Sequence, residues 1–335
     1  MRDVARLAGV SVATVSAVIN GSTNVSERRS TKVREAMEAL DYYPDQVARS
    51  LKVGKTGAIG MVIPDITHTF FPQVIRGAED TARQHGYSVI FCDSAEDAEE
   101  ERRHLNTLFS RRVDGVLIAC SDPSAAYENL MRRRFPIVFV DRIPRGLTHN
   151  AVSTDNVAAC IAATNHLIDL GHERIAFITG RLGLSPHMGR LEGFRKAMEA
   201  HNLPIRESYL CTGDGQVETG YGFGMELLRL DPPPTAIVSS NNNELLGLMR
   251  AISELRVDCP REVSVIGFDD SAWTMHFTPR LTIVAQPAHE VGKAAFEMLL
   301  AKMQAETPES QPQPELQLLP AELRVRDSTC PPLRK

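Results

Sequence analysis

The chain has 335 residues, 43% of them hydrophobic and 6% aromatic, and a formal net charge of −5. This length suits a small module joined to a larger body, and the composition is that of a globular α/β protein. The sequence has no run of about eighteen apolar residues and no N-terminal apolar segment with a cleavage site, so it predicts neither a membrane span nor a secreted product.

Charge is unevenly distributed along the chain. Residues 1–55 carry nine Lys and Arg against six Asp and Glu, a net charge of +3, so the rest carries −8. A mildly basic head on an acidic body is compatible with a DNA-binding module whose body stays off the phosphates.

The cysteines indicate a reducing compartment. They are far apart and form no C-x-x-C pair, which argues against disulfides or a zinc site. We therefore expect a cytoplasmic protein with no metal and no cofactor. The six are Cys92, Cys120, Cys160, Cys211, Cys259 and Cys330.

The first forty residues predict three short helices. Residues 2–8 form the first, Gly9 ends it, and Ser11 is placed to cap a second helix over 12–20. A third helix begins at Ser26. Two short helices joined by a turn that contains Gly are the pattern of a helix-turn-helix. Periodicity alone leaves a second interpretation open, in which this segment merely covers the body.

From Ala58 onward, short apolar strands alternate with helices, which indicates parallel sheets covered on both faces. About a dozen strands are too many for one open sheet, so we expect two doubly wound subdomains with a ligand at the carboxyl ends of their strands. The most evident strands are 58–63, 87–91, 115–119, 137–140, 175–178, 236–238 and 263–268. The expected helices are 72–85, 97–111, 124–134, 155–170, 187–201, 217–229, 242–255 and 287–303.

Three aspartates follow apolar strands at those ends. Carboxylates of Asp65, Asp141 and Asp269 could accept hydrogen bonds from sugar hydroxyls, and Arg190 and Asn241 could complete the set. The alternative is that each strand-end Asp simply caps the next helix.

Aromatic side chains near these strand ends could stack on a ligand. Phe70 and Phe71 open a helix, and Trp273 lies just beyond a strand end. For Trp273 a place in the ordinary core is the alternative.

A series of motifs runs in order along most of the chain. They include D-V-A-R-L-A-G-V-S-V-A-T-V-S at 3–16, V-S-E-R at 25–28, Y-x-P-x-x-V-A-R-S-L at 42–51, I-G-M-V-I-P-D-I at 59–66 and V-S-V-I-G-F-D-D at 263–270. With these motifs, residues 1–330 resemble the lactose/galactose-repressor (LacI/GalR) family of bacterial regulators. This resemblance implies a helix-turn-helix head and a periplasmic-binding-protein-like body. It also implies which residues contact DNA. Those of the head are Ser11, Val12, Ala13, Thr14, Ala17 and Asn20, and those of a hinge helix are Ala48, Arg49, Leu51 and Lys52.

Some positions depart from the family pattern. Ala17 stands where many members carry a polar residue that contacts bases, so we expect more reliance on thymine methyl contacts. Leu184 replaces the ligand arginine of purine-responsive members, which argues against a nucleobase effector. Gly215 stands where relatives often place an aromatic residue.

The resemblance implies a repressor that binds a palindromic operator as a homodimer, under the control of a sugar, sugar acid or sugar phosphate. The implied divisions are a head at 1–45, a hinge and linker at 46–57, an effector domain at 58–335, an N-subdomain of 58–154 plus 286–314, and a C-subdomain of 155–285 plus 315–330. Two rivals are a sugar-transport protein, which the attached head disfavours, and a nucleotide-using enzyme, whose glycine-rich motifs are missing.

Overall fold

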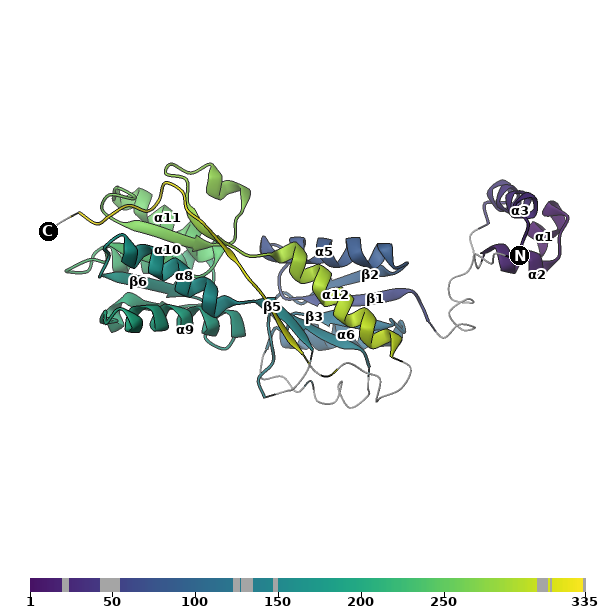
Figure 1. Cartoon of the computed structure of the whole chain (residues 1–335), viewed down its shortest axis with the longest axis horizontal. Coiled ribbons are helices and arrows are strands. Elements are labelled where there is room, and N and C mark those ends of the chain that lie inside the picture. Colours follow the sequence, from purple (N-terminus) through teal and green to yellow (C-terminus); the bar gives the residue numbers. More distant parts are fainter. Residues whose placement is uncertain are drawn as a thin grey trace. The chain divides into compact units, whose positions relative to one another are not determined.

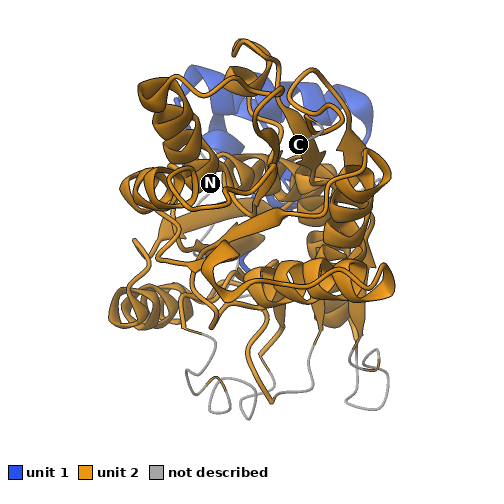
Figure 2. Cartoon of the chain, turned by 90° about the vertical axis from the view of Figure 1, so that its left-hand side faces the viewer, with its two compact units in different colours: residues 1–56 blue, residues 57–335 orange. Residues whose placement is uncertain are grey.

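The computed structural model describes residues 1–19, 24–42, 55–122, 127, 135–146, 150–305, 313 and 315–333. The chain divides into a head, residues 1–56, and a body, residues 57–335 (Figure 2). Within the described part, no helix has the length and apolar character needed to cross a membrane.

The head is the three-helix unit that the sequence predicts. Its helices are α1 (Arg2–Ala8), α2 (Val12–Ile19) and α3 (Glu27–Ala39). One fully buried valine from each helix, Val4, Val15 and Val33, meets in a small core. Gly9 ends α1 in the left-handed region, at φ 65°, which lets the chain turn into α2.

Over its described residues, the body contains two six-stranded sheets. The first has the order β11-β5-β4-β3-β1-β2 and the second β12-β10-β9-β8-β6-β7, and every pairing is parallel except that of β10 with β12. The first sheet consists of β1 (Ala58–Ile63), β2 (Ser88–Asp93), β3 (Gly115–Ile118), β4 (Ile137–Val140), β5 (Ala151–Thr154) and β11 (Leu316–Leu319). The second consists of β6 (Ile175–Thr179), β7 (Leu210–Thr212), β8 (Ala236–Ser239), β9 (Ser264–Phe268), β10 (Thr282–Ala285) and β12 (Glu322–Arg324).

Helices cover both faces of each sheet, as expected for doubly wound subdomains. Side chains of β6 alternate between the two layers of core: Ile175 and Phe177 face one, and Ala176 and Ile178 the other. The first subdomain is the first sheet with α5 (Phe70–Gln84), α6 (Ala98–Ser110) and α12 (Ala288–Gln304). The second is the second sheet with α8 (Asn156–Asp169), α9 (Ser185–Ala200), α10 (Val217–Leu227) and α11 (Asn242–Leu255), and with two short 3-10 turns, η1 (Glu207–Tyr209) and η2 (Ala272–Met275).

Three segments of the chain cross between the subdomains (Figure 1). They follow β5, β10 and β11. The expectation that 315–330 lies wholly in the C-subdomain is wrong for β11, which pairs in parallel with β5 of the first sheet. The crossing comes at Pro320, which has no N–H to continue the strand ladder. The other subdomain limits stay predictions.

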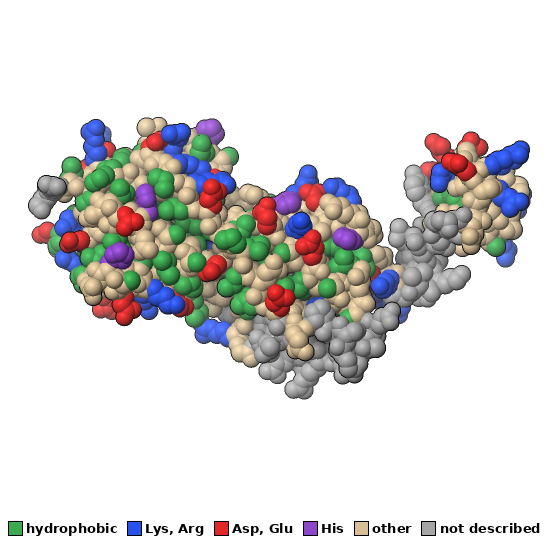
Figure 3. Space-filling model, in the orientation of Figure 1, with side chains coloured by type: hydrophobic (Ala, Val, Ile, Leu, Met, Phe, Trp, Pro, Cys, Tyr) green, Lys and Arg blue, Asp and Glu red, His purple; other side chains and the backbone are tan. Residues whose placement is uncertain are grey.

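Charged side chains of both signs are interspersed on the visible face of the body (Figure 3). That surface is typical of a solvated protein rather than of one continuous anion-binding face. The helix expected over 124–134 lies outside the described residues, apart from Tyr127.

The close approach of α5 and α12 generates a stability prediction. A Cβ on Gly292 would lie 1.9 Å from the carbonyl oxygen of Val74, whereas a Cβ on Gly222 in α10 would meet nothing within 4 Å. We expect Gly292→Ala to lower the free energy of unfolding by about 1–3 kcal/mol through overpacking. Gly222→Ala should raise it by up to about 1 kcal/mol, because alanine favours helix. Urea unfolding of both variants measures this, and equal effects would contradict the packing account.

Candidate functional site

The first turn of α2 presents the candidate DNA-contact surface of the head. Ser11 caps the helix, because its Oγ accepts the backbone N–H of Thr14 at 3.1 Å. Val12 is 43% exposed and Ala13 is exposed too, whereas Val15 is fully buried and anchors the helix. Ala17 is half-buried. The turn therefore offers two apolar side chains and a capped N-terminus to a partner.

Several predicted DNA contacts lie outside the described residues. They are Asn20 of the head and the hinge residues Ala48, Arg49, Leu51 and Lys52. Their roles stay predictions from the resemblance.

A cleft of about 940 Å³, part of it open solvent, lies between the two subdomains. It brings together seven of the eight residues that the sequence proposes for effector binding, which are Asp65, Phe70, Phe71, Asp141, Arg190, Asn241 and Asp269. The eighth, Trp273, does not line it. Trp273 sits in η2, 5.4 Å from the ring of Phe277, and packs against the core of the second subdomain. These surroundings are those of an ordinary core position, which was the alternative to a stacking role for Trp273.

Two of these carboxylates occupy equivalent places in the two sheets. Asp141 directly follows β4 and Asp269 directly follows β9, and both have left-handed backbones, with φ of 60° and 70°. The N–H of Asp141 donates to Val152 O at 2.8 Å, and the N–H of Asp269 donates to Val284 O at 3.0 Å. Non-glycine residues rarely hold this conformation, and such strain gathers at functional sites. Here it keeps both carboxylates buried at the cleft.

Within the described part of the chain, three buried acceptors in the cleft have no hydrogen-bond partner: Asp141 Oδ1, Asp269 Oδ2 and Gln286 Oε1. Gln286 Nε2 donates to the other oxygen of Asp269 at 2.6 Å, and His68 Nε2 lies 3.9 Å from Asp269 Oδ2. Burial raises the pKa of the Asp141 carboxyl, and the charges of Arg190 and Arg142 oppose that rise. Unpaired buried acceptors are costly, so this cleft is built to receive donors.

Arg190 is the cation at the floor of the cleft. It is 4% exposed, its Nε donates to Asn156 Oδ1 at 2.7 Å, and its Nη1 donates to the carbonyl of Ser240. The guanidinium carbon lies 4.3 Å from the ring centroid of Phe268. Burial lowers the pKa of Arg190, while the charges of Asp269 and Asp141 oppose that effect. These contacts fix the guanidinium in one place.

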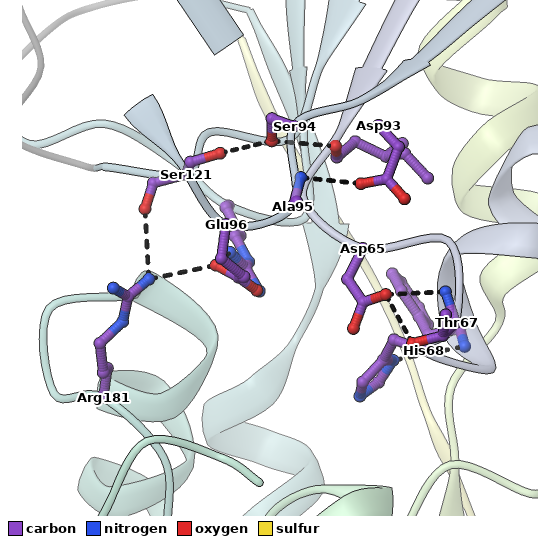
Figure 4. Close-up of polar contacts among 12 residues, drawn as sticks. Asp65, Thr67, His68, Asp93, Ser94, Ala95, Glu96, Ser121 and Arg181 are labelled. Carbon is purple, nitrogen blue, oxygen red and sulfur yellow. Dashed lines mark hydrogen bonds and ion pairs between the residues drawn. The ribbon is translucent and has the colours of Figure 1, made fainter. Parts of the chain in front are cut away.

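Asp65 and Asn241, the two other polar candidates, also make local hydrogen bonds to nearby residues of the chain. Asp65 accepts hydrogen bonds from the N–H and Oγ1 of Thr67, at 2.8 and 2.6 Å (Figure 4). Asn241 Oδ1 caps α11 by accepting the N–H of Glu244 at 2.9 Å. Both residues line the cleft as well, so capping and ligand contact are compatible at these positions.

Other residues of the cleft were not singled out from the sequence. They include His68, Glu96, Arg142, Arg181, His187 and Gln286. Arg142 and Arg181 lie two and three residues beyond the predicted strands 137–140 and 175–178, so the rule that found the aspartates could have found these two. Glu96 and Gln286 follow strand ends that the sequence did not predict, those of β2 and β10. His187 differs: burial lowers its pKa well below the usual value, which makes it a neutral polar group.

No group of three or more His, Cys, Asp or Glu side chains that could hold a metal ion occurs in the ranges that the structure describes. The arrangement instead fits a ligand that donates several hydrogen bonds. Aspartates, a fixed arginine and a glutamine combine with aromatic rings to line a concave space.

Comparison with known proteins gives the family. Residues 1–45 match the description "Bacterial regulatory proteins, lacI family", and residues 164–329 match "Periplasmic binding protein-like domain". The ribose operon repressor of Escherichia coli is 37% identical over 322 residues, which are 96% of this chain and 97% of that protein. The chain belongs to the LacI family of bacterial regulatory proteins.

Solved structures of LacI-family proteins share its architecture. The lac repressor dimer bound to operator and an anti-inducer is 27% identical, with 98% of each chain covered and a TM-score of 0.85. A LacI-family regulator from Enterococcus faecium with bound ribose is 30% identical, covers 82% of this chain and 99% of that one, and gives a TM-score of 0.70. The predicted fold is confirmed, and this LacI-family chain is a DNA-binding transcriptional regulator rather than an enzyme.

One buried carboxyl lies just behind the cleft of this LacI-family chain. Glu244 is fully buried, and its Oε2 accepts a hydrogen bond from Asn241 Nδ2 at 2.6 Å. Its Oε1 has no hydrogen-bond partner among the residues that the structure describes. Burial raises the pKa of Glu244 to about 8; the charge of Asp214 adds to the rise, while Arg190 and the N–H of Gly215 oppose it. Because Asn241 and Gly215 both line the cleft, Glu244 holds one wall of the site in place.

The raised pKa predicts how stability depends on pH. Between about pH 4.5 and 8, folded Glu244 holds a proton that the unfolded chain has released. The free energy of unfolding therefore falls as pH rises, by up to about 1.4 kcal/mol per pH unit for this group. Glu244→Gln lacks this slope, so its stability relative to wild type should grow up to about pH 8 and then level off. If urea unfolding of wild type and Glu244→Gln gave parallel pH profiles, the raised pKa of Glu244 would be contradicted.

Proposed function

We propose that this regulator represses transcription by binding a two-fold operator as a dimer, and that its effector is a neutral sugar of the ribose class. The effector would bind in the cleft between the subdomains and change operator affinity. The observation that carries the effector assignment is the set of three buried acceptors without partners in that cleft.

Sugar hydroxyls match these acceptors. A hydroxyl donates one hydrogen bond and accepts others, so a polyhydroxylated ring can serve Asp141, Asp269 and Gln286 while accepting from Arg190. The rings of Phe70 and Phe71 supply apolar surface beside them. Both rings come from the first subdomain. On the opposite wall, Gly215 of the second subdomain stands where relatives often place an aromatic residue. The second subdomain therefore brings polar groups to the cleft at this point rather than an aromatic ring.

The charges of the cleft favour a neutral ligand over an acid. Three arginines and five carboxylates line it, and His187 adds no charge at neutral pH, because burial lowers its pKa. The cationic residues are Arg142, Arg181 and Arg190, and the carboxylates are those of Asp65, Glu96, Asp141, Asp214 and Asp269. A sugar acid or sugar phosphate would enter a site where negative charge already prevails.

Two relatives support ribose in particular. The 37% identical relative from Escherichia coli is named a ribose operon repressor, and the Enterococcus faecium regulator was solved with ribose bound. Leu184 lines the cleft of this chain, so the arginine that the resemblance associates with purine effectors is missing there.

On the DNA side, we propose that the exposed first turn of α2 enters the major groove. Val12 and Ala13 would then make apolar contacts with thymine methyl groups. Residues 46–53 would form the hinge that responds to the body. Coupling between the two sites is reciprocal, so an effector that weakens operator binding must itself bind less tightly to the operator complex.

The test uses an operator selected from random duplexes and fluorescence anisotropy of the full chain. Ribose should change operator affinity at least tenfold, and Asp269→Asn should lower ribose affinity tenfold or more, as expected for losing a charged hydrogen-bond partner. Glu192→Gln, on the outer surface of α9, removes the same charge outside the cleft and should leave the ribose response intact. A wild-type chain that binds no pentose or hexose and selects no palindrome would overturn the proposal.

A further inference from the structure

We propose that Glu96 determines effector specificity, by occupying the guanidinium groups of Arg142 and Arg181 and so excluding phosphorylated and acidic sugars. The inference deepens the proposed function and rests on it. Nothing in the family motifs quoted above includes Glu96; the assignment comes from its contacts.

Glu96 bridges two arginines, one from each subdomain. Both nitrogens of the Arg142 fork reach its carboxylate at 2.7 Å, and Arg181 Nη2 reaches the same carboxylate at 3.1 Å. Arg181 also donates to the carbonyl of Ser121 at 3.4 Å (Figure 4). Forked pairs of this kind are the strong form of an arginine–carboxylate contact. The carboxylate therefore takes the place that an anionic substituent of a ligand would need.

The backbone is arranged to hold Glu96 there. Ala95 and Glu96 are consecutive non-glycine residues in the left-handed region, with φ of 50° and 61°. The N–H of Ala95 donates to Asp93 Oδ1 at 2.9 Å, and the N–H of Glu96 donates to Pro64 O at 2.7 Å. Backbone strain of this kind persists only where the surroundings enforce it. The strained backbone of this loop thus directs Glu96 into the cleft.

Size does not exclude an extended ligand at this end of the cleft. A second cavity of about 780 Å³, part of it open solvent, is also lined by Glu96, Arg181 and Leu184, and Arg145 lines it too. A phosphate on a sugar would have room beside these arginines. Charge opposes the binding of a phosphate here. The phosphate would have to displace Glu96 from Arg142 and Arg181, or lie against the Glu96 carboxylate that is paired with them. Repulsion of a competing ligand is a common route to specificity.

The test compares ribose with ribose 5-phosphate by calorimetry on the full chain, for wild type and Glu96→Gln. We expect wild type to prefer ribose, and the affinity ratio to shift at least tenfold toward the phosphate in Glu96→Gln. Ribose itself should bind more weakly to this variant, because the contact across the cleft is lost. Glu99→Gln, an exposed carboxylate paired with Arg102 in α6, is the matched control and should keep the wild-type ratio.

A second variant gives a result of opposite sign and does not depend on the folding of the first. The side chain of Arg181 is half-exposed, and Arg181→Gln leaves Glu96 paired with Arg142 alone. This variant should bind ribose 5-phosphate even more weakly, relative to ribose, than wild type does. If wild type binds ribose but neither variant moves the ratio, Glu96 has no such role and this inference alone fails. If wild type prefers the phosphate, the inference also fails. If wild type binds neither compound, this inference fails together with the assignment of ribose as the effector, whereas operator binding is tested separately.

Discussion

The structure of the body depends on keeping two carboxylates buried where its halves meet. Asp141 and Asp269 are 6% and 5% exposed, and each belongs to a different subdomain. Arg190 lies close enough to both for each carboxylate to act on its pKa. Burying such charges is costly without partners, and Arg190 compensates for only part of that cost. The proposed sugar effector would supply the rest through its hydroxyl donors.

Other contacts join the two subdomains across the cleft. Ser271 Oγ lies 3.0 Å from Thr69 Oγ1, and the N–H of Ile143 donates to Ser185 Oγ at 2.9 Å. Together with the bridge from Glu96 to Arg181, they join the subdomains around the rim of the site. In the proposed regulation, the two subdomains turn against each other at the three chain crossings that follow β5, β10 and β11. A ligand that prefers one angle between them shifts the population toward it.

The sequence predicted much of this, because long periodic patterns determine long elements. The seven apolar strands and the α helices on described residues lie where periodicity placed them, and seven proposed site residues line one cleft. Short strands such as β7, with three residues, have too little pattern to be found alone. Trp273 shows the limit of reasoning by residue type, since its ring packs on Phe277 outside the cleft. The pairing of Glu96 with two distant arginines depends on loop conformation, which periodicity does not encode.

A crystal structure of the protein grown with ribose would show which groups of the cleft bind the sugar. We expect sugar hydroxyl oxygens within about 2.5–3.2 Å of the buried acceptors Asp141 Oδ1, Asp269 Oδ2 and Gln286 Oε1. Arg190 should donate a hydrogen bond to the same ring. A structure in which ordered water alone meets those three atoms while the sugar binds elsewhere would contradict this expectation.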